Sequence, residues 1–270
     1  MKIFNGTLEA KTLDSRITYL VQNKGSVGEL AVIQIGDNPS SAKYISIKNK
    51  IADKVGIKLR VYKFSAILSL KDLQTKITEI ANQQTTTGCI IQLPLPDKNL
   101  NTLLNLIPIK KDIDCLSSAA QKRFYIDCDF SFFPPVIRAV QHFIDYAKVD
   151  LSSSSTVYVV GMGFLVGRPL AHYFKHMYKC NVVTTDAYEK DTFISADLLI
   201  LSAGVPGLVK SSNIAKNCNV IDFGSSVINE KIVGDLQIST VHKHLGYVSP
   251  SPGGMGPLVV RYLLLNHLQI

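Results

Sequence analysis

Short apolar runs alternate with amphipathic stretches along most of the chain, and this alternation restricts the fold more than any other feature. In the first half, runs suited to buried strands cover 29–36, 58–64 and 88–96, and stretches with helical periodicity cover 40–55, 70–83 and 99–107. Strands that alternate with helices favour a parallel sheet covered by helices. The sequence therefore predicts an α/β fold.

A second alternating series follows a break in the pattern. Residues 115–133 interrupt the alternation, and Pro134-Pro135 then opens a helical stretch that reaches about Ala147. Further strand candidates lie at 156–161, 180–186, 196–204 and 219–224, and a last helix lies near 256–268. We expect two α/β domains with a cleft between them, one made of 1–135 with a C-terminal helix at about 256–270, and one made of 136–255.

Composition limits the class of protein. Hydrophobic residues make up 46% of the 270 and charged residues 19%, which is typical of a globular protein with real cores. The N-terminal segment MKIFNGTLEAKTLDSR lacks the apolar core of a signal peptide, and no stretch reaches the roughly 18 apolar residues of a membrane span. The cysteines form no C-x-x-C pair, which favours a reducing compartment: Cys89, Cys115, Cys128, Cys180 and Cys218. We expect a soluble, cytoplasmic protein without a membrane partner.

The chain is basic, with a formal net charge of +8, and residues 1–150 carry 20 basic and 14 acidic side chains. A basic surplus suits nucleic acid, a nucleotide or a polyanionic small molecule, and it suits a solvated surface equally well. No run of five or six basic residues occurs, and no RNA- or DNA-binding motif accompanies the charge. We therefore expect no nucleic-acid partner.

A glycine-rich segment follows the apolar run TVYVV. Gly161, Gly163 and Gly167 form the pattern G-x-G-x-x-x-G at a predicted strand-to-helix turn. Glycines permit a tight turn and let backbone N–H groups approach a pyrophosphate, which the helix N-terminus also favours. The segment therefore predicts a dinucleotide site, to which we also assign Met162 and Val166; the alternative is a structural turn that binds nothing.

Asp186 ends the next predicted strand, 25 residues after Gly161. An acidic residue at this position accepts hydrogen bonds from the adenosine ribose hydroxyls and repels a 2′-phosphate. Taken alone, Asp186 favours NAD over NADP, and the alternative is an aspartate that points to solvent. We assign Thr185, which precedes it, to the same site.

Four polar residues of the first half fall where they could converge. Tyr44 and Lys48 are spaced i, i+4 in the segment NPSSAKYISIKNK and share one helix face. Gln92 ends a strand, where ligands bind in open parallel sheets, and Asp114 follows in KKDIDC. Each alone is more often a surface or packing residue. Together they predict a site, because a lysine that such neighbours partly desolvate has a lowered pKa and can transfer protons.

The sequence also resembles a known family, that of the bifunctional methylenetetrahydrofolate dehydrogenase/methenyltetrahydrofolate cyclohydrolases. The resemblance covers nearly the whole chain, in IGDNPSSAKYISIK, QLPLP, KKDID, VGRP, VIDFG, VGDL and PSPGGMGP. Y-x-x-x-K followed by Q-L-P-L-P and by P-x-P-G-G-x-G-P is highly specific to that family. The resemblance implies that 1–135 with the C-terminal helix is the folate-binding catalytic domain, that 136–255 is a Rossmann-type dinucleotide-binding domain, and that the protein is a homodimer through the latter.

The resemblance further implies roles for the four polar residues. Lys48 would be the catalytic lysine that moves protons in the cyclohydrolase step, and Gln92 would hydrogen-bond it and tune its basicity. Tyr44 would stack on the folate, and Asp114 would hold the pterin ring by hydrogen bonds. The remaining residues of the folate pocket would be Leu93, Pro94, Pro252, Gly253 and Gly254.

The implied reactions are oxidation of 5,10-methylene- to 5,10-methenyltetrahydrofolate by hydride transfer, and hydrolysis of that product to 10-formyltetrahydrofolate. The cofactor would lie along Gly161–Gly163 and reach Ser225 beyond VIDFG. The expected cofactor is NADP, with NAD possible because of Asp186. The expected partners are tetrahydrofolate derivatives, whose glutamate carboxylates suit the basic first half.

The sequence departs from the family pattern at several places. Cys115 stands where the family has the glycine of Asp-Gly, Gly163 replaces a serine, and Asp186 stands where NADP-using relatives carry a polar or basic residue. Residues 115–139 align poorly, without a clean C-T-P-x-G segment. Two alternatives therefore stay open: a cyclohydrolase with weak or lost dehydrogenase activity, and a non-catalytic folate- or nucleotide-binding protein on the same fold.

The histidines predict no metal site. His172 and His176 are spaced i, i+4, but no glutamate follows His172 as H-E-x-x-H requires. His242 and His244 flank Lys243 without an obvious partner. A serine nucleophile is not expected either, because no G-x-S-x-G elbow is present.

Overall fold

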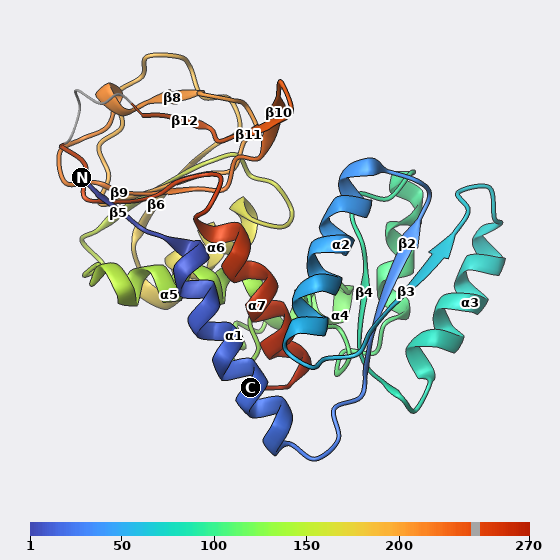
Figure 1. Cartoon of the computed structure of the whole chain (residues 1–270). Helices are drawn as coiled ribbons and strands as arrows, with labels where there is room; N and C mark the ends of the chain where they lie inside the picture. The colour runs from blue at the N-terminus through green and yellow to red at the C-terminus, as the bar shows by residue number, and fades with distance from the viewer. Residues whose placement is uncertain (239–243) are drawn as a thin grey trace. The chain divides into compact units, whose positions relative to one another are not determined.

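The computed structural model describes residues 1–238 and 244–270, which form two compact units (Figure 1). The N-terminal unit comprises Lys11–Pro135 and Val260–Ile270, and the C-terminal unit comprises Met1–Ala10 and Val136–Val259. No helix in the described parts of the chain is both long enough and apolar enough to span a membrane.

The N-terminal unit is built on a three-stranded parallel sheet of order β3-β2-β4. Its strands are β2 (Glu29–Ile35), β3 (Leu59–Phe64) and β4 (Thr86–Ile91). All seven residues of the central strand β2 are buried, as expected for a strand covered on both faces. In Figure 1, α2 (Pro39–Lys54) and α3 (Leu70–Asn82) flank this sheet.

Side-chain caps determine where these two helices begin. The Asn38 side chain accepts a hydrogen bond from the Ser41 N–H at 3.0 Å, and Pro39 follows in the first turn, where its missing N–H costs nothing. Ser69 caps α3 in the same way, by accepting from the Asp72 N–H at 3.1 Å. The predicted bounds 40–55 and 70–83 therefore agree closely with the observed helices.

The third expected strand is shorter than predicted. β4 ends at Ile91, and residues 92–96 continue as an irregular segment because its prolines have no N–H to donate to a ladder. The stretch expected to be helical at 99–107 is the 3₁₀ helix η1 (Lys98–Leu106), and the interrupted segment contains a short helix, α4 (Ser118–Tyr125).

The C-terminal unit contains a six-stranded, wholly parallel sheet of order β1-β13-β9-β7-β5-β6. The chain enters at β5, places β6 on one side, and then builds outward on the other side through β7, β9 and β13. The order therefore reverses between β5 and β7, and ligands of open α/β sheets bind at the strand C-termini beside such a point. The strands are β1 (Lys2–Ile3), β5 (Thr156–Val160), β6 (Asn181–Thr185), β7 (Leu198–Leu201), β9 (Asn219–Asp222) and β13 (Tyr247–Ser249).

Helices and short strand pairs complete this unit. The helices are α5 (Pro135–Ala147), α6 (Gly167–Tyr173), its π-helical continuation η2 (Phe174–Tyr178) and the 3₁₀ turn η3 (Ser211–Asn213). β8 (Val209–Lys210) pairs in parallel with β12 (Leu236–Gln237), and β10 (Ser226–Ile228) pairs antiparallel with β11 (Lys231–Val233).

The first ten residues belong to the C-terminal unit, which differs from the expected placement of all of 1–135 in one domain. Lys2 and Ile3 pair with Tyr247 and Val248 of β13, and the Phe4 ring is fully buried with its centroid 5.2 Å from that of Phe143. Helix α1 (Gly6–Asn23), which was not expected, begins there and ends in the N-terminal unit. Helix α7 (Met255–His267) is divided between the two units in the same way.

Candidate active site and cofactor site

Lys48 lies on α2 and donates a hydrogen bond from Nζ to Oε1 of Gln92 at 2.8 Å. Gln92 immediately follows β4, and its backbone N–H donates to the Ile33 carbonyl of β2 at 2.8 Å. Its Nε2 donates to the Leu93 carbonyl at 2.7 Å, which directs the amide oxygen towards the lysine. The helix and the strand end thus bring together the two residues that the sequence pattern paired.

Asp114 is the charged neighbour of Lys48. Burial lowers the pKa of the Lys48 ammonium, and the negative charge of Asp114 opposes this effect. Burial likewise raises the pKa of Asp114, against the lowering effect of Lys48. The site therefore contains a lysine that releases its proton more readily than a solvated lysine, beside a carboxyl group that retains its proton more readily.

The backbone around Asp114 is held by Asp112, which the sequence analysis missed. Asp112 is buried, and its two carboxylate oxygens accept from the Leu116 N–H at 3.1 Å and the Ser117 N–H at 2.8 Å. Cys115 adopts a φ of 60°, the left-handed conformation that glycine adopts easily. Cys115 therefore takes a glycine-type backbone at the position where the family has glycine. An aspartate two positions before Asp114 was the available signal, because aspartate readily accepts hydrogen bonds from N–H groups that follow it.

The other residues of this unit that the sequence assigns to the substrate lie close in the chain to Lys48 or Gln92. Tyr44 lies one turn before Lys48 on α2 and is 45% exposed, so its ring is accessible to a ligand. The Ser41 hydroxyl donates to the Leu93 carbonyl at 3.3 Å, and the Leu93–Pro94 peptide bond is cis. The segment after β4 is thus fastened to the same helix that carries Tyr44 and Lys48.

Pro252, Gly253 and Gly254 belong to the C-terminal unit and follow β13. Gly253 has a φ of 94°, which favours glycine, and its carbonyl accepts from the Thr7 N–H at 3.1 Å. A Cβ on Gly254 would lie 2.3 Å from the Ser249 hydroxyl oxygen, so a side chain does not fit there. Backbone geometry and close packing therefore require the two glycines of this turn.

The predicted glycine turn occurs between β5 and α6. Gly161 has a φ of 91°, and its N–H donates to the Thr185 carbonyl at 2.8 Å. A Cβ on Gly167 would lie 1.9 Å from the Gly161 carbonyl oxygen, whereas a Cβ on Gly163 would meet no atom within 4 Å. Close packing of the helix start on the strand end therefore requires Gly167, as expected for a dinucleotide-binding turn, and Gly163 leaves space where the family has serine.

Asp186 contacts this glycine turn directly. One carboxylate oxygen accepts from the Met162 N–H at 2.6 Å, and Arg168 donates from Nε to the Met162 carbonyl at 3.0 Å. Thr185 accepts from the Ala187 N–H at 3.1 Å through its hydroxyl oxygen. Val166 immediately precedes α6. Apart from Ser225, the residues assigned to the cofactor from sequence therefore lie at the C-terminal ends of β5 and β6 and in the turn between β5 and α6.

Ser225 is exposed beyond β9, next to two buried aspartates that the sequence analysis did not single out. Asp222 accepts from three backbone N–H groups, and Asp235 accepts from those of Ala203 and Gly204. Both lie in family segments, VIDFG and VGDL. A carboxylate flanked by apolar residues and glycine was the available signal, because a buried charge needs backbone donors.

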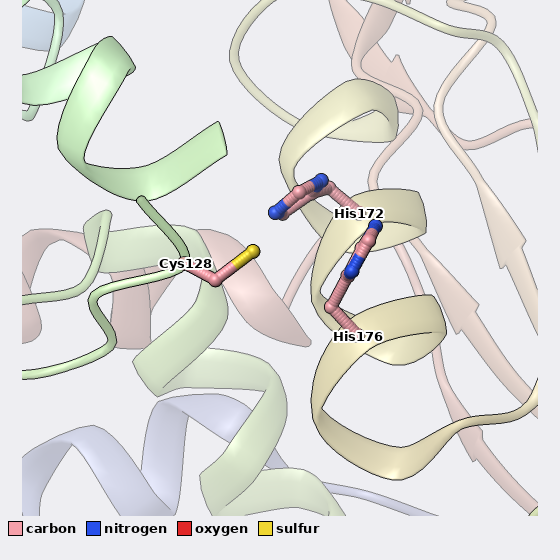
Figure 2. A group of neighbouring side chains, drawn as sticks. All are labelled: Cys128, His172 and His176. Carbon is pink, nitrogen blue, oxygen red and sulfur yellow. The ribbon is translucent and has the colours of Figure 1, made fainter. Parts of the chain in front are cut away.

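His172 and His176 lie together on the α6–η2 helix, as Figure 2 shows. Their rings are stacked with centroids 4.2 Å apart. His244 is 2.8 Å from the Ile214 carbonyl oxygen through Nε2, and His242 and Lys243 lie outside the described residues. The absence of a metal site stays a prediction.

Two sequence models of one family match almost the whole chain. The model described as tetrahydrofolate dehydrogenase/cyclohydrolase, catalytic domain, matches residues 4–114, and the model of the NAD(P)-binding domain matches residues 134–270. The chain belongs to the tetrahydrofolate dehydrogenase/cyclohydrolase family. Residues 115–133, between the matched ranges, are the segment that interrupts the predicted α/β pattern.

Individual relatives agree with this assignment. The chain is 34% identical to the bifunctional protein FolD of Mycoplasmopsis synoviae over 286 residues, which cover 100% of this chain and 99% of the relative. It is 32% identical to the corresponding protein of Aquifex aeolicus over 277 residues, which cover 99% and 94% of the two chains.

Solved structures of the family share the fold. The bifunctional enzyme FolD from Campylobacter jejuni superposes with a TM-score of 0.88 at 28% identity, covering 100% of this chain and 98% of that one. The Trypanosoma brucei enzyme, complexed with NADP cofactor and inhibitor, has a TM-score of 0.88 at 25% identity and covers 98% and 95% of the two chains. The expected family, the two-domain α/β fold and the bifunctional enzyme class are confirmed.

Proposed function

We propose that this chain oxidises 5,10-methylenetetrahydrofolate to 5,10-methenyltetrahydrofolate and hydrolyses the product to 10-formyltetrahydrofolate, with Lys48 as the residue that moves the proton in the second step. The observation that carries the proposal is the 2.8 Å hydrogen bond from Lys48 to Gln92, with Asp114 as the charged neighbour of the lysine. The family membership supports both activities.

In the hydrolysis, water adds to the methenyl carbon, and the neutral Lys48 amine takes the proton that this water loses. The Lys48 ammonium then returns this proton to N5, the bond from that carbon to N5 breaks, and the hydroxyl on the carbon releases its proton to solvent as the formyl C=O forms. The lowered pKa of Lys48 supports this role, because it increases the fraction of neutral amine at neutral pH. Gln92 holds the Nζ atom in place, and Asp114 binds the pterin ring.

In the oxidation, a dinucleotide held in the C-terminal unit would supply the nicotinamide ring that accepts a hydride from the methylene carbon. The Gly161–Gly167 turn would hold the pyrophosphate with backbone N–H groups, and Ser225 would contact the same cofactor. Two glycines support the assignment, because a Cβ on either Gly161 or Gly167 would collide with the neighbouring backbone. Such close packing of the turn on the start of the following helix is what a dinucleotide-binding turn requires of its glycines.

The proposed cofactor is NADP, with NAD as the second candidate because of Asp186. The carboxylate of Asp186 is bonded to the Met162 N–H, at the end of β6, where it would lie near the adenosine ribose. A negative charge there disfavours a 2′-phosphate, while the exposed Arg168 side chain nearby favours one. These two charges oppose each other, so the ratio of the two cofactors must be measured.

One assay tests the proposal as a whole. Purified protein is given methylenetetrahydrofolate with NADP or with NAD, and methenyltetrahydrofolate alone in a second reaction. We expect dinucleotide reduction in the first reaction and hydrolysis in the second. Hydrolysis without reduction of either dinucleotide contradicts the bifunctional assignment, and the absence of both activities contradicts the enzyme assignment.

The proposed assembly is a homodimer through the C-terminal unit, in the cytoplasm. The β10–β11 hairpin supports the assembly, because Val227 and Ile228 are 64% and 45% exposed on it and a two-stranded ribbon leaves strand edges open to pairing. The five cysteines, all among the described residues, form no disulfide, which fits a reducing compartment. Sedimentation of the wild type and of Val227→Lys distinguishes a dimer through this hairpin from a monomer.

A further inference from the structure

The loop that follows β7 packs directly on the glycine turn of the cofactor site. A Cβ on Gly161 would lie 2.5 Å from the Ser202 carbonyl carbon and 2.6 Å from the Ala203 nitrogen, so the two backbones are in close contact. The Ser202 hydroxyl donates to the Gly161 carbonyl at 2.7 Å. The position of this loop therefore affects the shape of the turn.

Asp235 holds the same loop from its other side. One of its carboxylate oxygens, Oδ2, accepts from the Ala203 N–H at 2.7 Å and from the Gly204 N–H at 3.0 Å. The residue is fully buried, and in the described part of the chain no donor reaches its other oxygen, Oδ1. A Cβ on Gly224 would lie 2.2 Å from that oxygen, so the glycine leaves room for the carboxyl group.

Asp222 in turn holds the backbone of Asp235. Its oxygens accept from the Gly224 N–H at 2.8 Å, the Asp235 N–H at 3.1 Å and the Leu236 N–H at 2.9 Å. A Cβ on Gly234 would lie 2.0 Å from Oδ2 of Asp222. The two aspartates thus connect the end of β9 to β12, and β12 to the loop after β7, through backbone N–H groups.

Burial of these two carboxyl groups costs free energy, because both lose their contact with water. Burial raises the pKa of Asp222 to about 6, against the lowering effect of its three backbone donors. Burial raises the pKa of Asp235 as well. A buried carboxyl group fixes the backbone that it accepts from, because each N–H would otherwise be left unsatisfied away from water.

We propose that Asp235 is a positioning residue for hydride transfer: it fixes the backbone of Ala203 and Gly204 against the glycine turn, and so sets how tightly and in what orientation the dinucleotide is held. Asp235 has no exposed surface for a ligand to contact, so it acts only through this loop. The proposal rests on the proposed dinucleotide site. It predicts that the two activities of the enzyme respond differently to a change at Asp235, because Lys48, Gln92 and Asp114 lie in the other unit.

The test compares Asp235→Asn with Asp235→Ala in the full-length enzyme. Asparagine keeps one oxygen for the two N–H groups, and alanine keeps none. We expect Asn to change the KM for NADP by less than roughly threefold and Ala to raise it by more than roughly tenfold with a lower dehydrogenase kcat, since two buried donors lose their acceptor. The kcat for methenyltetrahydrofolate hydrolysis should stay within roughly twofold in both variants.

Asp197→Ala is the matched control. Asp197 accepts from the Thr156 N–H at 2.7 Å at the opposite end of the same sheet, so this variant removes a comparable bond far from the cofactor loop. We expect its KM for NADP to be unchanged. If Asp235→Ala does not fold, Ser202→Ala takes its place, because it removes the hydroxyl that bonds the Gly161 carbonyl at 2.7 Å and the Val160 carbonyl at 3.3 Å, and it should raise the KM for NADP in the same selective way.

An unchanged KM for NADP in the folded variant, or a parallel fall of both activities, overturns the positioning role. A wild-type enzyme that reduces neither dinucleotide contradicts the proposed dehydrogenase activity instead. The role of Asp235 is then decided by the dissociation constant of NADP for the same variants, measured by fluorescence titration. An NADP dissociation constant that is equal in wild type and Asp235→Ala also overturns the positioning role of Asp235.

Discussion

The Nζ atom of Lys48 lies 2.8 Å from the Oε1 atom of Gln92, and this hydrogen bond joins helix α2 to the end of strand β4. The hydrogen bond holds the lysine Nζ atom at the strand end, and burial lowers the pKa of Lys48. The amide acceptor carries no net charge, so the lysine can still exist as a neutral amine. A carboxylate in the same place would stabilise the charged ammonium form. We expect the chemistry of the N-terminal unit to depend on this pair.

Replacement of the lysine should abolish hydrolysis. Lys48→Met keeps the length of the side chain and removes the group that accepts and returns the proton. We expect the rate of methenyltetrahydrofolate hydrolysis to fall by roughly 10²–10⁴-fold, the usual contribution of a positioned acid–base group. The measurement is the loss of methenyltetrahydrofolate absorbance with time, and a near-normal rate would contradict the role of Lys48.

A carboxylate in place of the amide should move the pH dependence of hydrolysis. Gln92→Glu puts a negative charge beside the lysine, which raises the pKa of Lys48 because the charge stabilises the ammonium form. The neutral amine then forms only at higher pH, so the rising limb of the rate profile shifts to the alkaline side. Gln92→Met is the control, because it loses the hydrogen bond without adding charge and should lower the rate without an alkaline shift. An unshifted profile for Gln92→Glu would show that Lys48 is not the titrating base.

Two glycines of the same turn should respond differently to one added methyl group. Gly167→Ala places a Cβ 1.9 Å from the Gly161 carbonyl oxygen, so the turn must move, whereas Gly163→Ala meets no atom within 4 Å. We expect Gly167→Ala to weaken dinucleotide binding by roughly tenfold or more and Gly163→Ala to change it by less than about twofold. Titration with NADP measures the affinity of each variant. Equal affinities in the two variants would mean that the cofactor does not bind at this turn.

The charge of Asp186 should affect the choice of cofactor. Asp186→Ser removes the carboxylate that bonds the Met162 N–H at 2.6 Å. We expect the ratio of kcat/KM for NADP to that for NAD to rise by roughly tenfold, since a like-charge repulsion of about 1.4 kcal/mol gives that factor. Asp186→Asn keeps an acceptor for Met162 and should produce a similar rise. A constant ratio in both variants would mean that the carboxylate does not face the 2′ position.

His267 should make the N-terminal unit sensitive to acid. The side chain is 3% exposed, and burial lowers its pKa to about 4 although its bond to the Gly28 carbonyl raises it. The unfolded chain therefore binds a proton below about pH 6.5 while the folded chain stays neutral until about pH 4. The free energy of unfolding should therefore fall by about 3 kcal/mol as the pH drops from about 6.5 to about 4.

The variant His267→Gln tests the histidine directly. Urea unfolding at several pH values should show a smaller loss of stability between pH 6.5 and 4 for the variant than for wild type. His176→Gln, in the other unit, controls for the loss of a histidine as such. Identical pH dependence of wild type and His267→Gln would place the acid sensitivity elsewhere in the chain.

Local patterns determined most of the fold. Strands and helices alternate where apolar periodicity predicts them, because burial on one or two faces of an element leaves a period in the sequence. The spacing of Tyr44 and Lys48 is likewise local, since residues four apart share a helix face. The amphipathic stretch of α1 was nevertheless missed, and the prolines after Ile91 shortened a strand that hydropathy alone extended.

Only the tertiary structure decided which distant residues meet. The position of Gln92 depends on the Ile33 carbonyl of β2, which accepts from its backbone N–H, and the buried role of Asp235 depends on a loop more than thirty residues earlier in the chain. The pairing of β1 with β13, which puts the first residues in the C-terminal unit, joins opposite ends of the chain. Hydrogen bonds and burial between remote segments leave no period in the sequence. Residue types, spacing and the family resemblance therefore indicated Lys48, Gln92 and Asp114, while only the fold showed the hydrogen bonds and burial that act on them.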